Sequence, residues 1–440
     1  MDQVHLFSKD MLKYKYWAPA FLLIFCAHCS GESYKFGSDS NQRESKGYEL
    51  FTLDEQEVPP GSIKSIQFGK TGSVSNAPVI TLGSNESLNL SFDSISEEGQ
   101  QFRLEITHHD IDWSRSSLPI EFFIDGQQNF YVTGGRRSRF RDVNYYHYST
   151  TFPDQSFRFL VSGNYLVHVY DNESNDELFT LPFFVSENVG RISSRSEKVF
   201  NRSRSGRAFE QLFTLYNYPE FVQFPQFDLS FRYAQNKLWG TTKEPDIFDT
   251  SVEGEVEFHL SRDQLYPADF DFNILDLQTL RINVQQILDV NLVSEPINVV
   301  LREDVQNFST IPIKVGQQRF GTIDNDRTSR YVDVNFSFVP QLSLPPSADI
   351  YLAGDFNQWH IQPEYKLSYD SLSTWWKTKA LIKQGSYAYK YVQLSNDGTE
   401  AIVLDDAFSR QRQEYTSFVY FLDPNQRFYR LLQAQVFYGN

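Results

Sequence analysis

Hydrophobic and polar residues alternate along most of this chain in short runs, and glycine, asparagine, aspartate or proline residues separate the runs. A period of two residues places alternate side chains on one face of a β-sheet, whereas a helix needs a period near 3.6. Strands are predicted at residues 63–68, 79–82, 87–92, 101–108, 121–124, 156–161, 165–170 and 178–185, and turns at 83–85, 125–126 and 162–164. Many short strands without a helical repeat between them predict an antiparallel β-sandwich.

The same alternation continues into the C-terminal half, with strands predicted at residues 227–233, 255–260, 297–301 and 332–338. The segment from residues 418–421 to Tyr438 is predicted to form the closing strands of the C-terminal module. Residues 265–281 mix the helical and the strand period, so both remain open there. The prolines Pro340, Pro345 and Pro346 predict a boundary because they remove hydrogen-bond donors from a ladder. We therefore expect a leader at 1–28, a flexible segment at 29–46, a first β-sandwich at 47–188, a basic linker at 189–208, a middle β domain at 209–339 and a C-terminal β-sandwich at 340–440.

Composition supports a mostly β fold and narrows the classes of partner. Aromatic residues make up 16% of the 440 residues, and flat rings pack well on pleated sheets. The formal net charge is -16. An acidic chain is a poor ligand for nucleic acid and for anionic lipid, both of which attract basic surfaces. A basic partner or a soluble compartment suits this charge better.

The N-terminus has the pattern of a secretory signal. Lys9, Lys13 and Lys15 precede an apolar run at residues 17–25, which is too short to span a bilayer. Cys29 lies at the end of this leader, where a cysteine is the acylation site of bacterial lipoproteins, so a lipid anchor is one interpretation. An ordinary cleaved signal is the other, because the residues before Cys29 do not follow the usual lipoprotein pattern.

The sequence offers little that resembles catalytic chemistry. It contains neither a Gly-x-Ser-x-Gly elbow nor a His-Glu-x-x-His pair, and it contains no phosphate-binding loop. His108, Asp110 and Asp112 would share one face of a strand, as metal ligands do, but turn and strand hydrogen bonds explain them better. We therefore expect neither an enzyme nor a metal or other cofactor.

Two groups of arginines stand out in this acidic chain. Arg136, Arg137, Arg139 and Arg141 follow a Gly-Gly pair, and Arg202 and Arg204 lie in the predicted basic linker. Solvated surface charge explains both groups, and so does docking against an acidic partner. Because loops carry binding residues more often than strands do, all six are candidate partner contacts.

The C-terminal region resembles early-set immunoglobulin-like modules, a group that includes glycogen-binding domains. The resemblance lies in the segment Gly-Asp-Phe-Asn-Gln-Trp ending at Trp359, in the pair Trp375-Trp376, and in Tyr-Ala-Tyr-Lys-Tyr at 387–391. It implies that Trp359, Trp375 and Trp376 could form a sugar-binding platform. Structural packing is the other interpretation, and because Trp375 and Trp376 are adjacent in a strand, only one can be buried.

The N-terminal region resembles the plug-protein family of the type IX secretion system. The residues are Asp112-Trp113-x-x-Ser, the turn Phe123-x-Asp125-Gly126, the block Tyr-Tyr-His-Tyr-Ser at 145–149, and Ser-Gly-Asn-Tyr-x-Val at 162–167. The resemblance implies tandem immunoglobulin-like, early-set β-sandwich modules. It also implies a non-enzymatic protein in the periplasm, at the inner face of the outer membrane, that plugs the translocon barrel. The alternative is an exported lipoprotein that binds polysaccharide through its C-terminal module.

Overall fold

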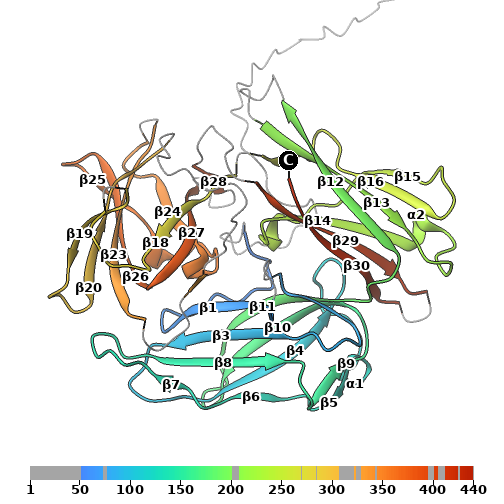
Figure 1. Cartoon of the computed structure of the whole chain (residues 1–440), viewed down its shortest axis with the longest axis horizontal. Helices are drawn as coiled ribbons and strands as arrows, with labels where there is room; N and C mark the ends of the chain where they lie inside the picture. Colours follow the sequence, from blue (N-terminus) through green and yellow to red (C-terminus); the bar gives the residue numbers. More distant parts are fainter. Residues whose placement is uncertain are drawn as a thin grey trace, which may run out of the picture. The chain divides into compact units, whose positions relative to one another are not determined.

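The structure is a computed structural model, and it confirms the mostly β fold. It describes residues 51–72, 77–200, 208–268, 270–283, 285–306, 322–323, 329–341, 344–394, 401–404, 412–424 and 427–439. Nearly all regular structure in these residues is β-strand, with two helices of four residues each and three short 3-10 turns. The strands form three β-sandwiches, which we number in the order in which the chain enters them (Figure 1).

The first sandwich closely follows the predicted strands. One sheet has the order β1-β3-β8-β7 and the other β2-β11-β10-β4-β6, with a β5-β9 ribbon at one end. The elements are β1 Ile63–Lys70, β2 Val79–Thr81, β3 Leu88–Ser94, β4 Phe102–His109, α1 Ile120–Phe123, β5 Ile124–Gly126, β6 Phe130–Val132, β7 Arg136–Arg137, β8 Tyr146–Phe152, β9 Phe157–Phe159, β10 Gly163–Asp171 and β11 Glu177–Ser186. The strand expected at 121–124 is instead a helical turn that leads into β5.

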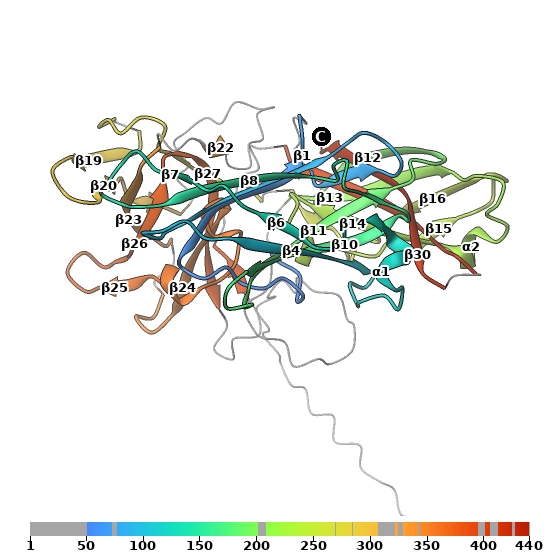
Figure 2. The ribbon, with the colours of Figure 1, turned by 90° about the horizontal axis from the view of Figure 1, so that it is seen from below.

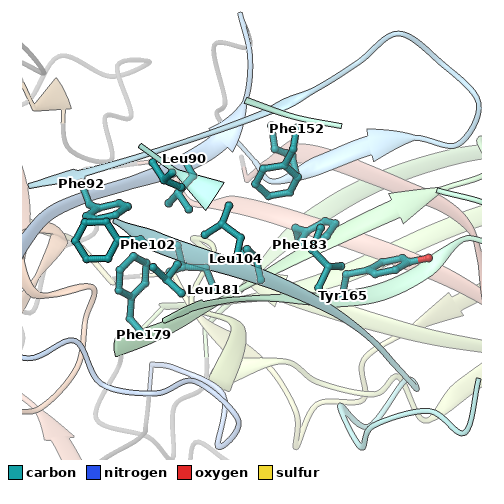
Figure 3. Close-up of a cluster of buried hydrophobic side chains, with 14 of the residues drawn as sticks. Leu90, Phe92, Phe102, Leu104, Phe152, Tyr165, Phe179, Leu181 and Phe183 are labelled. Atoms are coloured by element: carbon teal, nitrogen blue, oxygen red, sulfur yellow. The ribbon is translucent and has the colours of Figure 1, made fainter. Parts of the chain in front are cut away.

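Rings from both sheets fill the core of the first sandwich (Figure 3). Phe92 lies edge-on to Phe102, with ring centroids 4.9 Å apart, and Tyr165 stacks on Phe183 at 5.2 Å. The Tyr165 hydroxyl donates to the carbonyl of Val161, so the buried polar end is satisfied. These contacts explain why alternate residues of the predicted strands are aromatic.

The second sandwich is built from two separate parts of the chain. Its sheets have the orders β12-β13-β16-β15 and β14-β29-β30, with β17 beside β13. The elements are β12 Arg191–Phe200, β13 Ala208–Asn217, α2 Pro225–Asp228, β14 Leu229–Gln235, η1 Trp239–Thr241, β15 Ile247–Asp249, β16 Glu255–His259, β17 Tyr266–Pro267, β29 Glu414–Leu422 and β30 Tyr429–Tyr438. Strand β12 runs through the segment that we expected to be a basic linker, and it pairs with β13 along its whole length.

The third sandwich is inserted between the two parts of the second. Its strands are β18 Asn273–Asp276, β19 Ile287–Asn291, β20 Ile297–Leu301, β21 Asp304–Val305, β22 Thr322–Ile323, β23 Tyr331–Val339, β24 Asp349–Gly354, β25 Ser368–Asp370, β26 Trp375–Lys383, β27 Gly385–Leu394 and β28 Ala401–Val403, with the 3-10 turns η2 Asp355–Asn357 and η3 Pro363–Tyr365. One sheet has the order β19-β20-β23-β26-β25, and β27 lies at the centre of the other.

This insertion differs from the linear division that the prolines predicted. Strand β23, before the prolines, pairs with β26 after them, so the expected boundary at 339/340 runs through one sheet. Strands β29 and β30 were expected to close the C-terminal module, but they pair with β14 and complete the second sandwich. Proline clusters end individual strands, and they do not reveal which sheet the next strand joins.

Candidate functional site: an arginine loop above a buried charge cluster

The arginine loop, which we define as residues 133–145, connects β6 to β8. Arg136 and Arg137 pair with His147 and Tyr146 as the short strand β7, and Gly135 permits the close approach. A Cβ atom on Gly135 would lie 2.3 Å from the Tyr148 ring, so no larger residue fits. Gly134 has a φ of 75°, which favours glycine, so both glycines before the arginines have a structural cause.

All four arginine side chains of the loop are exposed. Among the residues that the structure describes, none of the four guanidinium groups pairs with a carboxylate, and Arg137 only donates to the amide oxygen of Asn144 at 3.4 Å. The loop backbone is nevertheless held, because the Ser138 amide donates to the carbonyl of Tyr145 at 2.8 Å. The loop thus presents four positive charges on an ordered backbone.

The base of the arginine loop is attached to the third sandwich. The Tyr145 hydroxyl donates to the carbonyl of Ser329 at 2.7 Å, and the Arg330 guanidinium lies 4.0 Å from the centre of the Phe140 ring. Asp142 lies 3.8 Å from the Arg330 guanidinium. A movement of the loop would therefore alter the contacts at the start of β23.

Directly beyond this attachment lies a buried charge cluster, which we define as Ser65, Asp93, His147, Tyr331 and Lys383. The Lys383 ammonium donates to Asp93 Oδ2 at 2.7 Å, and both side chains are fully buried. Tyr331 donates to the same oxygen at 2.8 Å, and His147 Nδ1 donates to Asp93 Oδ1 at 2.8 Å. Every oxygen of the Asp93 carboxylate is thus satisfied, as a buried charge requires.

The donor and the acceptor can also be assigned in the hydrogen bond between Ser65 and Tyr331. Ser65 Oγ lies 2.6 Å from the Tyr331 hydroxyl. Because Tyr331 has one proton and gives it to Asp93, Ser65 must be the donor in this bond. Burial raises the pKa of the Tyr331 phenol well above its usual value, which keeps it a donor. The cluster therefore joins β1, β3 and β8 of the first sandwich to β23 and β26 of the third through one set of hydrogen bonds.

Two of the motif blocks, the one at Trp113 and the one at residues 162–164, form a second joint, between the first and second sandwiches. The Trp113 ring packs edge-on against Phe184 at 5.5 Å, in a buried cluster that also contains Trp239 and Phe418. Asp112 accepts hydrogen bonds from the amide and hydroxyl of Ser114, which confirms its predicted role in the turn.

The Ser-Gly-Asn segment contributes to the same joint. Ser162 Oγ accepts from the Leu431 amide at 3.0 Å, and the Tyr420 hydroxyl donates to Asn164 Oδ1 at 2.8 Å. Gly163 has a φ of 146°, and a Cβ atom there would lie 2.4 Å from the His108 ring. The segment predicted as a turn is therefore the start of β10 and an inter-sandwich contact.

His108 and His109 are structural residues of this joint. Burial lowers the pKa of each imidazole to about 4, so both are neutral at pH 7. His109 Nδ1 lies 2.6 Å from the carbonyl of Trp113, and His108 Nδ1 lies 2.9 Å from Ser116 Oγ. Within the described ranges, no group of three histidine, cysteine, aspartate or glutamate side chains is placed to hold a metal ion.

The three tryptophans proposed for sugar binding do not form a platform. Trp376 is buried in the core of the third sandwich, and Trp359 is buried against Phe51 and Phe272 in a different cluster. Trp375 is half-buried, which confirms that only one of the adjacent pair is in the core. Trp359 borders a cleft of about 150 Å³, smaller than the ~300–1,000 Å³ typical of ligand pockets.

The other predicted site residues, Arg202, Arg204 and Cys29, lie outside the described residues. Sequence reasoning missed the buried charge cluster. Asp93 follows an apolar strand and Lys383 ends one, but the chain has 56 acidic and 40 basic residues, and nothing local marks these two. No helix in the described part of the chain is long and apolar enough to cross a membrane.

Comparison with known proteins identifies the first sandwich. Residues 63–187 match the family model described as type 9 secretion system plug protein, first domain. This range contains all four motif blocks and the arginine loop. The match confirms, for the first sandwich, the resemblance that the motifs predicted. No curated protein matches the chain.

Among solved structures, a hypothetical protein from Parabacteroides merdae ATCC 43184 is similar over 87% of this chain and 99% of its own length. The TM-score is 0.76 and the sequence identity 21%, so the likeness shows a shared fold. A tetra-tandem repeat from a large adhesion protein has 10% identity over 82% of this chain and 74% of its own. Its TM-score is 0.15, which does not indicate a shared fold.

Proposed function

We propose that this chain is a non-enzymatic component of the type IX secretion system that plugs the periplasmic end of the outer-membrane translocon. The observation that carries the proposal is the match of the first sandwich to the plug-protein first domain. In this proposal the arginine loop contacts an acidic rim of the translocon. Four exposed arginines without a carboxylate partner among the described residues support that role, because such charges are available to a partner.

The internal joints also suit a plug. A plug must occupy a wide opening without unfolding, and the hydrogen-bonded joints tie the first sandwich to the other two. Release must also remain possible, which favours small contacts with charge-complementary borders over one extensive apolar interface. The arginine loop provides such a contact on an ordered backbone.

Export and anchoring are separate parts of the proposal. The leader at 1–28 would direct the chain to the periplasm, where it would lie at the inner face of the outer membrane. Cys29 would be its acylated residue if the leader is of the lipoprotein type. Replacement Cys29→Ser should then remove the lipid mass and release the protein from the membrane fraction, and an unchanged mass would exclude the anchor.

Co-purification tests the plug proposal. Tagged full-length protein should retain the translocon barrel at low salt, and the replacement of Arg136, Arg137, Arg139 and Arg141 by serine should reduce retention at least tenfold. The matched control replaces the exposed residues Arg158, Arg262, Arg281 and Lys379 by serine, which removes the same charge elsewhere. Absence of the barrel from the wild-type preparation would overturn the proposal, and equal loss in both variants would overturn the role of the loop.

A further inference from the structure

The second sandwich exposes a group of large apolar side chains, which we call the phenylalanine patch and define as Phe221, Phe224, Phe227 and Phe248. Phe227 is 77% exposed and Phe224 59%. Among the described residues, four of the five exposed phenylalanines of the chain belong to this patch. Exposed aromatic side chains concentrated at one place mark an interaction surface, whereas scattered ones do not.

The patch is a single surface, because its segments meet at the start of β14. Helix α2 runs directly into β14. The Phe248 ring of β15 packs at 5.4 Å on Phe231 of β14, and the Phe221 ring packs at 5.2 Å on Phe421, which pairs with Leu229 of β14. In both views α2 and β15 lie at the same end of the second sandwich (Figures 1 and 2).

The protruding rings are held in place before any partner binds. Phe224 begins the turn of α2, and its carbonyl accepts from the amides of Phe227 and Asp228, both at 2.8 Å. The Asp228 carboxylate accepts in return from the Phe224 amide at 2.9 Å, and Pro225 is buried beneath the turn. A surface ordered in advance loses little conformational entropy on binding, which raises affinity.

The border of the phenylalanine patch is acidic. Residues 218–228 and 243–254 contain six acidic residues, and Lys243 is their one basic residue. The Arg430 guanidinium also lies against the patch, 5.2 Å from the centre of the Phe221 ring, but Glu187 pairs with it. Lys243 donates to the backbone carbonyls of Gln264 and Leu265. Among the described residues, no cation pairs with four exposed acids of this border, namely Glu220, Asp246, Asp249 and Glu253. An anionic lipid surface would repel this border, whereas a basic protein surface would attract it.

We propose that the phenylalanine patch is a second docking surface for the translocon, and that its complement is an apolar groove bordered by lysine and arginine side chains. This inference rests on the proposed function, and it adds a contact of opposite charge to the arginine loop. Two contacts of opposite sign on one chain fix the orientation of the plug, because the reversed orientation places like charges together. Aromatic anchors in the groove would supply most of the binding energy of this contact.

Retention of the purified translocon by the full-length protein tests the inference. Replacement of Phe224 and Phe227 by serine should weaken retention at least tenfold, because the two most exposed rings of the patch are lost. The matched control replaces Leu292 and Val293 by serine; these are 66% and 90% exposed on the third sandwich, and their loss should leave retention unchanged.

Photocrosslinking is a second test, and it keeps an aromatic ring at each position of the phenylalanine patch. A photoreactive phenylalanine analogue at position 227 should crosslink to the translocon, and the same analogue at Leu372, which is 95% exposed, should not. Wild-type binding without crosslinking from position 227 and without an effect of the serine pair would overturn this inference alone. Crosslinking only to a second copy of the chain would also overturn it. Failure of the wild-type chain to bind would overturn the proposed function as well.

Discussion

Strand β8 lies next to two regions that both contain cationic side chains, which are buried in one region and exposed to solvent in the other. At one of them, the buried charge cluster, Lys383 is fully buried and donates to Asp93 between two sandwiches. At the other, the arginine loop, four cations are exposed and no carboxylate among the described residues pairs with them. His147 belongs to the cluster and is also the partner of Arg136 in the β7-β8 ladder, so the two regions are adjacent.

The comparison separates charges that hold the molecule together from charges that are available to a partner. A buried charge must be neutralised within the protein, because the cost of removing an ion from water is several kcal/mol. An exposed arginine has no such requirement, and its loss costs the fold little. The cluster is therefore expected to control stability, whereas the loop is expected to control binding.

The largest effect should follow the replacement Lys383→Ala. It leaves the Asp93 carboxylate buried without its ion partner, and breaking a buried pair in this way costs about 3–5 kcal/mol. Urea unfolding of the variant and the wild type measures this difference in the free energy of unfolding. The double variant Asp93→Asn, Lys383→Met should recover part of the loss, because no unpaired charge remains. A loss below about 1 kcal/mol for Lys383→Ala would contradict the assigned role of the cluster.

The adjacent tryptophans extend the comparison to apolar residues. Trp376 is 2% exposed in the core of the third sandwich, so Trp376→Ala should lower the free energy of unfolding by about 3–5 kcal/mol. Trp375 is half-buried on the opposite face, and Trp375→Ala should cost much less. Thermal unfolding of the two variants compares them directly. Equal losses would contradict the burial difference, and glucan binding that depends on Trp375 would revive the polysaccharide alternative.

The stability of the protein should depend on pH through its buried imidazoles, whereas the exposed arginines stay charged over the same pH range. Burial lowers the pKa of His360 to about 4, while an unfolded histidine titrates near pH 6.5. Between these values the unfolded chain binds a proton that the folded chain does not, so stability falls as pH decreases from 6.5 towards 4. The variant His360→Leu should gain stability relative to wild type over this window, by up to about 1.4 kcal/mol per pH unit. A constant difference between pH 7 and pH 5 would contradict the neutral buried imidazole.

The smallest effect on stability should come from the arginine loop. Replacement of all four arginines by serine should change the free energy of unfolding by only about 0.5 kcal/mol, because the side chains are exposed. Urea unfolding checks this value beside the retention assay. A loss of several kcal/mol would make the arginines part of the fold and would remove the contrast with the cluster.

Local strand structure was predictable because alternation is a local property. The predicted strand at 101–108 is β4, and the run at 178–185 is the larger part of β11. The insertion of the third sandwich was not predictable, because the pairing of β14 with β29 joins residues almost two hundred positions apart. Nothing in the sequence of either strand indicates which strand it will pair with.

The candidate site was also predictable only where it depends on local sequence. The exposed arginines of the loop and the turn role of Asp112 followed from residue type and spacing. The pairing of Asp93 with Lys383 did not, since it depends on how two sandwiches meet. The Ser-Gly-Asn segment lies within the range that matches the plug-protein first-domain model, but its hydrogen bonds to Leu431 and Tyr420 became visible only in the fold.

The central claim is that this chain closes the translocon, and the conductance of the translocon pore tests it most directly. Purified translocon in a planar bilayer should lose conductance when the mature protein is added at the periplasmic side. The variant with serine at Arg136, Arg137, Arg139 and Arg141 should leave the pore open at the same concentration, and the control with four charges removed elsewhere should close it. A pore that conducts equally with and without the wild-type protein would contradict the account.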